Sequence, residues 1–204
     1  MFNFNRFLKK QKQLSGELKF NQFANTTKEN RYPLLFEQSR AVIGNCKRVL
    51  SFGCSTGEEV ETLSKLYFQE SEVFGYDLNP EVIDIARAKY NHLFFSEYEK
   101  ISSYCFDAIF CCSVLCQFPI WFDYSFERFE ETLIYIDNLL NLGGYLIIYN
   151  SSFNFEDTKI FQDKYKVIKI RKEKLFNNAM VPLRDKNGTV KNLKPNVIFK
   201  KVKK

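Results

Sequence analysis

A turn of small residues after a short apolar run carries the clearest chemical signal in the sequence. The apolar run is Arg48–Phe52, and the turn reads Gly53-Cys-Ser-Thr-Gly57. Glycines at its two ends let the backbone approach a ligand that a Cβ atom would block. Glu58 and Glu59 then begin a helix, where acids stabilise the helix but repel a phosphate. The turn therefore predicts a site for a cationic cofactor rather than for a pyrophosphate.

An acid is spaced to complete this site. Asp77 follows the second apolar run, Val73–Tyr76. A carboxylate at the end of a strand can accept hydrogen bonds from both hydroxyls of a ribose. An isolated acid there is more often a helix cap or a loop residue, but its distance from the glycine turn favours the ribose.

The elements that must position these residues follow from the hydrophobic pattern. Short apolar runs alternate with helical periods, which predicts an α/β fold: a single-domain Rossmann-like sheet, mostly parallel, with helices on both faces. Strands are expected at residues 48–52, 73–76, 92–95, 106–112 and 145–149. Helices are expected after the turn, from Asn79, and over residues 125–142 with Gly143-Gly144 ending the last one. The first helix should bury one face, made of Val60, Leu63, Leu66 and Tyr67.

Beyond residue 150 the pattern changes to strand-like segments at 165–170 and 196–202, with a turn signal at Asp185–Gly188. We expect these segments to complete the sheet as an antiparallel C-terminal hairpin edge. The chain of 204 residues is then one domain. It would comprise an N-terminal helical cap (1–40), a cofactor-binding core (41–150) and a sheet-completing basic C-terminal part (151–204).

Over residues 45–150 the order of these features resembles the class I, or Rossmann-like, S-adenosylmethionine-dependent methyltransferases. The segment Phe52–Glu59 is similar to the turn of the chemotaxis-receptor methyltransferases, without their helical N-terminal domain. Two positions depart from the usual pattern: Ser51 stands where many members have an acid, and Ser55 replaces the middle glycine. The resemblance implies an enzyme that takes a methyl group from S-adenosylmethionine.

The same resemblance implies the residues around that cofactor. The turn residues would contact its methionine part, an acid its ribose, and a polar pair its adenine amino group, while the exit of the fourth strand would face its ammonium. The implied contacts of the methionine part are Phe52, Gly53, Cys54, Ser55 and Gly57. Asp77 is implied for the ribose, with Leu78 beside the adenine. Ser96 and Glu97 are implied for the adenine amino group, and Cys112 for the ammonium. Arg31 or Tyr32 would close over the cofactor carboxylate from the N-terminal cap.

The segment from Gln117 to Tyr124 follows the fourth strand, where this fold usually places acceptor contacts. It is aromatic and holds the only Trp, which suits sugars, aromatic metabolites or bases, although a loop packed into the core is an equal alternative. Asp123 and Tyr124 are the candidate catalytic groups, with Gln117 orienting the acceptor. Phe118, Trp121 and Tyr32 are the candidate acceptor-binding residues. The chain lacks Asn/Asp-Pro-Pro-Tyr/Phe after this strand, the usual motif of enzymes that methylate the amino group of adenine or glutamine. Together with the aromatic loop, this absence favours a small-molecule or glycan acceptor, methylated on a hydroxyl.

Charge leaves one alternative open. Net charge is +6, and residues 159–204 carry 15 Lys or Arg against 3 acids. Such a segment can bind a polyanion, so a nucleic-acid methyltransferase is the first alternative and a solvated basic surface the simpler interpretation. A non-catalytic binding module on the cofactor fold is the second alternative.

Cysteines and hydropathy indicate the compartment. The cluster of Cys105, Cys111, Cys112 and Cys116 invites a zinc interpretation. Zinc sites usually carry paired Cys on turns, often with His, and this chain has a single His, so we expect no metal and reduced thiols in the cytoplasm. No apolar stretch of about 18 residues is present, so no membrane span is expected.

Overall fold

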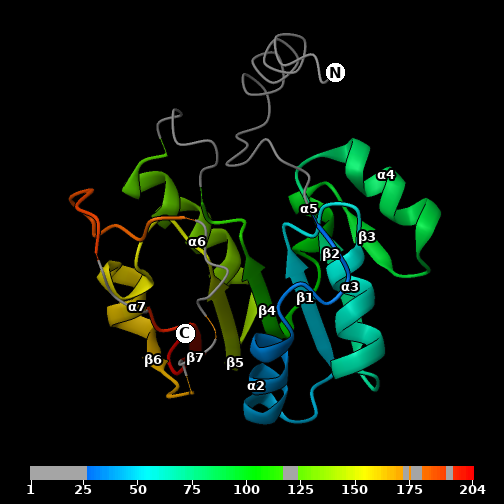
Figure 1. The fold of residues 1–204 in the computed structure, drawn as a ribbon, viewed down its shortest axis with the longest axis horizontal. Helices are drawn as coiled ribbons and strands as arrows, with labels where there is room; N and C mark the ends of the chain where they lie inside the picture. Colours follow the sequence, from blue (N-terminus) through cyan, green and yellow to red (C-terminus); the bar gives the residue numbers. More distant parts are fainter. Residues whose placement is uncertain (1–26, 117–123, 172–174, 176–180, 192–194) are drawn as a thin grey trace, which may run out of the picture.

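A seven-stranded sheet forms the centre of the protein (Figure 1). The computed structural model describes residues 27–116, 124–171, 175, 181–191 and 195–204. The strand order is β3-β2-β1-β4-β5-β7-β6. The strands are β1 (Arg48–Phe52), β2 (Glu72–Tyr76), β3 (Leu93–Phe95), β4 (Phe106–Cys112), β5 (Leu140–Tyr149), β6 (Tyr165–Val167) and β7 (Ile198–Lys201).

The first five strands are parallel, and β7 is antiparallel to both of its neighbours, β5 and β6. The predicted fold class is therefore confirmed. The chain runs outward from β1 through β2 to β3, then returns to β4 on the other side of β1. In open parallel sheets ligands bind at such a reversal, outside the carboxyl ends of the strands. The turn after β1, Asp77 after β2 and Ser113 after β4 all lie at this edge.

Helices cover both faces of the sheet (Figure 1). Their bounds are α2 (Pro33–Ile43), α3 (Glu58–Thr62), a π-helical turn η1 (Leu63–Tyr67), α4 (Pro80–Lys89), α5 (Tyr98–Ile101), α6 (Phe126–Leu139), a 3₁₀ turn η2 (Phe155–Asp157) and α7 (Lys159–Lys164). As expected, Asn79 caps α4 by accepting from the N–H of Glu81. Ser125 caps α6 in the same way, through the N–H of Arg128. Among the described residues, no helix combines the length and apolarity needed to cross a bilayer.

Two buried clusters lie on the two faces of the sheet. One contains Phe106 and Phe129 and brings α6 onto the sheet. The other contains Phe36, Val60 and Phe110 and brings α2 and α3 onto it. Because β1 and β4 contribute to both clusters, their carboxyl ends are held by packing from both sides, which gives the site a rigid base.

Two local expectations were wrong. Helix α6 ends at Leu139, and Gly143-Gly144 lie inside β5 instead of ending the helix. A Cβ on Gly144 would lie 2.8 Å from Leu140 Cδ1, so the glycine permits a tight approach within the strand. Leu66 is 58% exposed, because α3 passes into the π-helical η1 and the wider turn rotates this side chain off the buried face.

The antiparallel edge is fastened to α6 by a buried carboxylate. Asp137 is 3% exposed and forms ion pairs with Lys164 (2.7 Å) and Lys201 (2.9 Å). The hydroxyl of Tyr165 donates to the same carboxylate at 2.7 Å. Removing one partner of such a group leaves an uncompensated buried charge, so the cluster ties β6 and β7 firmly to the sheet.

Candidate functional site

The turn after β1 keeps its own amide groups occupied. The N–H groups of Gly53 and Cys54 both donate to the carbonyl of Tyr76, at 2.7 and 3.0 Å. The N–H of Ser55 donates to Asp77 Oδ2 at 2.9 Å. A pyrophosphate site needs free N–H donors, and these three are committed. The turn is suited instead to a ligand that is cationic where it meets the turn.

Gly53 is required by the protein itself. Its φ is +79°, and a Cβ there would lie 2.2 Å from Val114 Cγ2. The glycine therefore lets the segment after β4 pack directly onto the turn after β1. The sequence interpretation assigned this position to ligand approach, and the described contact is with Val114 instead. Gly57, with φ +92°, begins α3 from a left-handed conformation.

Ser55 and Asp77 provide the polar groups beside the turn. The Oγ atom of Ser55 is buried and has no hydrogen-bond partner, and its backbone is left-handed with φ 50°. An unpartnered buried hydroxyl is costly unless a ligand completes it. Asp77 Oδ1 accepts the N–H of Asn79 at 2.9 Å, and burial raises the pKa of this carboxyl. Each carboxylate oxygen of Asp77 keeps a further lone pair, which fits two ribose hydroxyls.

Glu59 is a site residue that the sequence interpretation treated only as a helix acid. The hydroxyl of Ser51 donates to its Oε1 at 2.8 Å. Burial raises the pKa of Glu59 to about 7, against the lowering effect of hydrogen bonds from Ser51 and Cys112 and of the charge of Arg31. The carboxyl thus lies between the ends of β1 and β4. The sequence signal for Glu59 was the serine at position 51. An acid usual at that position is absent, and Glu59 on α3 brings a carboxyl to the same place.

The segment before α2 brings Arg31 and Tyr32 to the same edge. Asn30 is left-handed (φ 46°), its N–H donates to Thr62 Oγ1 at 2.9 Å, and its Oδ1 accepts from the Tyr67 hydroxyl at 2.9 Å. The π-helical turn after α3 thereby fixes the segment. The positive charge of Arg31 lowers the pKa of both Glu59 and Tyr32. The charge of Arg31 therefore lies near these two groups at the same edge.

The other expected residues divide into three groups. Cys112 is buried beside Glu59, and Leu78 and Ser96 are half-buried at the same edge. Glu97 is exposed and pairs with Lys100 at 2.8 Å, which turns it toward solvent. Residues 117–123 of the acceptor loop lie outside the described residues, and they include the predicted site residues Gln117, Phe118, Trp121 and Asp123.

Tyr124 is described, and it is buried. It is 5% exposed and its ring packs 6.0 Å from the ring of Phe153. Burial raises its pKa well above the usual tyrosine range. These contacts favour a core position and argue against Tyr124 as the group that meets an acceptor.

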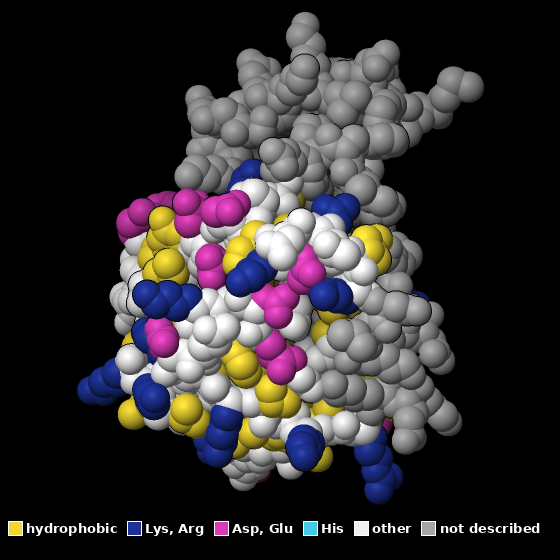
Figure 2. Space-filling view, turned by 90° about the vertical axis from the view of Figure 1, so that its left-hand side faces the viewer, with side chains coloured by type: hydrophobic (Ala, Val, Ile, Leu, Met, Phe, Trp, Pro, Cys, Tyr) yellow, Lys and Arg dark blue, Asp and Glu magenta, His cyan; other side chains and the backbone are white. Residues whose placement is uncertain are grey.

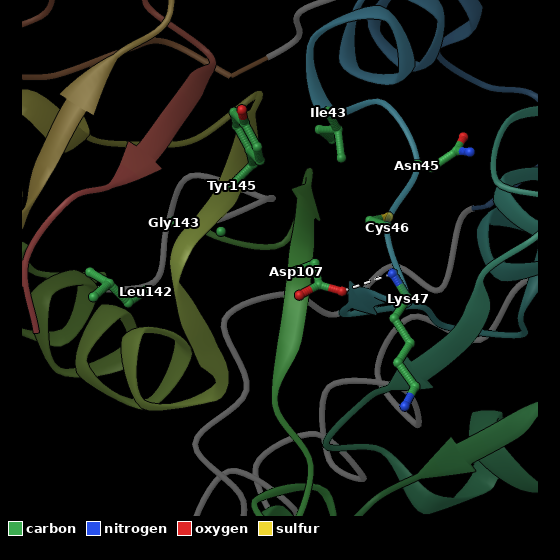
Figure 3. Close-up of a pocket in the computed structure, with 9 residues that line it drawn as sticks. Ile43, Asn45, Cys46, Lys47, Asp107, Leu142, Gly143 and Tyr145 are labelled. Carbon is green, nitrogen blue, oxygen red and sulfur yellow. Dashed lines mark hydrogen bonds between the residues drawn. The ribbon is translucent and has the colours of Figure 1, made fainter.

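A shallow pocket of about 380 Å³ lies at the opposite, amino edge of the sheet (Figure 3). Asp107 lies in it, and its carboxylate accepts the N–H of Lys47 at 2.9 Å and the side-chain amide of Asn141 at 2.9 Å. The N–H of Arg48 donates to the same carboxylate at 3.1 Å. The Asp107 carboxylate thus joins the starts of β1, β4 and β5 through hydrogen bonds. This edge carries none of the groups assembled around the turn.

Among the described residues, no group of three or more His, Cys, Asp or Glu side chains is arranged to hold a metal ion. Cys111, Cys112 and Cys116 are buried and Cys105 is exposed. Burial raises the pKa of Cys111 and Cys112 well above the usual thiol range, so neither is a ready thiolate.

Comparison with known proteins identifies the family. The family profile described as a methyltransferase domain matches residues 38–148, more than half of the chain. The chain belongs to this methyltransferase family. No curated protein sequence matches the chain.

The methyltransferase is also similar to solved structures, at low identity. One is the amino pentose methyltransferase CalS10 from Micromonospora echinaspora, with S-adenosylmethionine bound (20% identity, 64% of this chain and 53% of that chain, TM-score 0.49). Another is the plantazolicin methyltransferase BpumL in complex with SAH (18%, 71% and 53%, TM-score 0.46). The chain spans about half the length of these two proteins. Neither match supports the narrower likeness of the turn to chemotaxis-receptor methyltransferases.

Proposed function

We propose that this methyltransferase transfers the methyl group of S-adenosylmethionine to a hydroxyl of a small molecule or glycan. The observation that carries the acceptor class is the neutral character of Tyr32, Ser113 and Asn150, which meet at the exits of β4 and β5. Ser113 is hydrogen-bonded there to Tyr32 (2.6 Å) and to Asn150 (2.7 Å). Hydroxyls and an amide suit a neutral, hydroxyl-bearing acceptor.

For the cofactor, the proposal assigns three contacts. Asp77 would accept the ribose hydroxyls, and the unpartnered hydroxyl of Ser55 would complete its hydrogen bonding on the ligand. Glu59 would face the ammonium, because a buried carboxyl with a pKa of about 7 is stabilised in its ionised form by a cation. Arg31 would face the carboxylate at the same end of the ligand.

When bound, S-adenosylmethionine supplies a methyl group already activated on a sulfonium sulfur. The chain therefore has to align the acceptor and exclude water rather than generate a strong nucleophile. The buried strand ends and the segment carrying Val114, which packs on Gly53, form the dry wall of this site. The neutral groups after β4 would orient the acceptor hydroxyl.

The proposal is supported against a nucleic-acid acceptor by the mixed charge of one face. Figure 2 views the molecule from the α7 side. Among the described residues, its upper part shows Lys and Arg interspersed with Asp and Glu, and its lower part shows Lys and Arg with few acids. A phosphate backbone is bound by a continuous basic surface, and the described residues in the upper part of this face do not form one.

The test has two stages. Isothermal titration calorimetry with S-adenosylmethionine and its demethylated product should show binding, while NAD should not bind. Purified chain and cofactor are then incubated with a panel of sugars, phenols, amines and oligonucleotides, and products are detected by mass spectrometry. Methylation confined to hydroxyl acceptors supports the proposal. Methylation of amines or oligonucleotides instead would contradict the acceptor class, and absence of cofactor binding would contradict the assignment of the site.

A further inference from the structure

The exits of β4 and β5 hold two residues in a left-handed backbone conformation. Ser113 and Asn150 both have a φ of 56°. This conformation is uncommon for residues other than glycine and persists only where the surroundings fix it, often at functional sites. Here the N–H of Ser113 donates to the carbonyl of Tyr149 at 2.8 Å. The side-chain carbonyl of Asn150 accepts the N–H of Val181 at 3.0 Å. Both side chains are thereby aimed by their backbones.

Three side chains form a chain of hydrogen bonds at this place. The Asn150 Nδ2 group can only donate, and it donates to Ser113 Oγ at 2.7 Å. Ser113 Oγ and the Tyr32 hydroxyl lie 2.6 Å apart and share a second hydrogen bond. Burial raises the pKa of Tyr32 above the usual tyrosine range, so it keeps its proton.

One hydroxyl proton in this group of hydrogen bonds has no acceptor within the group. Ser113 and Tyr32 each bring one hydroxyl proton, and the single hydrogen bond between them consumes one. Since the Asn150 bond uses an amide proton, the second hydroxyl proton of the pair remains available. Tyr32 is 6% exposed, whereas Ser113 is half-buried at the end of β4. The hydroxyl of Tyr32 and the amide of Asn150 therefore donate to Ser113 Oγ, and the Ser113 hydroxyl proton is available to a ligand in the site.

We infer that Ser113 selects acceptors that carry a second oxygen beside the hydroxyl to be methylated. The inference rests on the proposed function. A hydrogen bond donated to the attacking oxygen would occupy the lone pair that must form the bond to the methyl carbon. Ser113 would instead donate to the oxygen beside it, so the lone pair of the attacking oxygen stays available. The cofactor carboxylate has a stronger partner in the charge of Arg31. The substrate class is then a vicinal diol, as in a sugar or a ring with adjacent hydroxyls.

The transfer step is balanced without a further reactant. The attacking oxygen forms a bond to the methyl carbon as the carbon–sulfur bond breaks, and that electron pair stays on sulfur. The proton of the attacking hydroxyl leaves to solvent. Ser113 neither gains nor loses a proton overall, so it is a positioning residue that contacts the acceptor, and its effect should fall on acceptor selection.

Paired probes test this selection with the full chain. Catechol is compared with phenol, and methyl glucoside with its deoxy analogue lacking the neighbouring hydroxyl, by release of the demethylated cofactor. We expect kcat/KM to favour the two-oxygen member by about tenfold, the scale of one hydrogen bond to a neutral group. In Ser113→Ala and Ser113→Gly the preference should vanish while the cofactor Kd stays within about twofold. Glycine also relieves the left-handed backbone, so agreement between the two variants assigns the effect to the hydroxyl.

Two further variants complete the test. Asn150→Asp presents a carboxylate that accepts a hydrogen bond from the Ser113 hydroxyl, so this donor is no longer available to the acceptor and the preference should be lost as in Ser113→Ala. Ser103→Ala, an exposed serine whose hydroxyl bonds only the carbonyl of Lys100 among the described contacts, should keep it. Equal turnover within both pairs, or a preference retained in Ser113→Ala, would overturn the inference while leaving methyl transfer to hydroxyls in place. Turnover of none of the four probes by a chain that binds cofactor would overturn both.

Discussion

Replacing Glu59 with glutamine tests the electrostatics of the cofactor site. In the free protein burial raises the pKa of Glu59 from 4.5 to about 7. This rise corresponds to about 3 kcal/mol against the ionised form, at about 1.4 kcal/mol per pKa unit. A cationic ligand reverses the preference. The wild-type protein should therefore release a proton on binding S-adenosylmethionine below pH 7, and at pH 6 its affinity should be about tenfold weaker than with Glu59 fully ionised.

Calorimetry at pH 5.5 to 7.5, in two buffers of different ionisation enthalpy, measures both the affinity and the protons released. Glu59→Gln keeps an acceptor for Ser51 but cannot ionise, so its affinity should be low and independent of this titration. Glu58→Gln is the matched control, because Glu58 pairs with Lys89 at 2.6 Å and its pKa is lowered. A wild-type affinity that does not change over this pH range, or an equal slope in Glu59→Gln, would refute the reasoning.

The same group has a linked effect on stability, with a defined sign. Because the folded pKa of Glu59 lies above 4.5, the folded state binds more protons than the unfolded state between pH 4.5 and about 7. The free energy of unfolding contributed by Glu59 is therefore fully present below that window and falls as the pH rises through it. Without cofactor, Glu59→Gln should gain stability relative to wild type as the pH rises, measured by urea unfolding at pH 5 and pH 8. A constant difference between the two proteins would contradict the assigned pKa.

Three further predictions address the rest of the molecule. Asp77→Ala removes the acceptor that holds the N–H groups of Ser55 and Asn79, so it should weaken cofactor binding by about 2–3 kcal/mol and lower Tm; unchanged calorimetric affinity would place the ribose elsewhere. Asp137→Asn leaves buried Lys201 without its counter-charge and should cost about 3–5 kcal/mol in urea unfolding, and a loss below 1 kcal/mol would contradict the role of this cluster. Treatment with EDTA should leave Tm unchanged, and near-equimolar zinc in metal analysis would contradict the interpretation of the cysteines.

The sequence predicts the parts of the fold that depend on local pattern. The first five strands, the cap at Asn79, the start of the helix near Ser125, and the placement of the turn and Asp77 at one sheet edge follow from periodicity, cap residues and strand order. The end of α6 was misplaced because Gly143-Gly144 is the usual signal for a helix end, whereas the structure uses it inside β5. The burial of Leu66 was wrong because nothing in the local pattern marks a π-helical turn.

The sequence indicates candidate site residues one segment at a time, but it does not show which side chains from separate segments contact one another. Gly53, Ser55 and Gly57 are neighbours in sequence, so their turn could be identified directly. Glu59 gains its character from Ser51 on β1 and Cys112 on β4, which lie far apart along the chain. Ser113, Tyr32 and Asn150 come from three separate segments, and their meeting depends on packing that no single stretch of sequence encodes.

The position of β7 between β5 and β6 has a consequence for how the chain folds. β6 precedes β7 in sequence but can join the sheet only through it. Until β7 pairs with it, β5 presents Tyr145, Leu146 and Ile147 on an open strand edge, which is a template for pairing with another chain. The contacts that close this edge join residues near 146 with residues near 199, and such distant contacts form slowly. Substitutions that weaken β7 should therefore reduce the yield of folded protein through aggregation during refolding before they alter the affinity of the distant cofactor site.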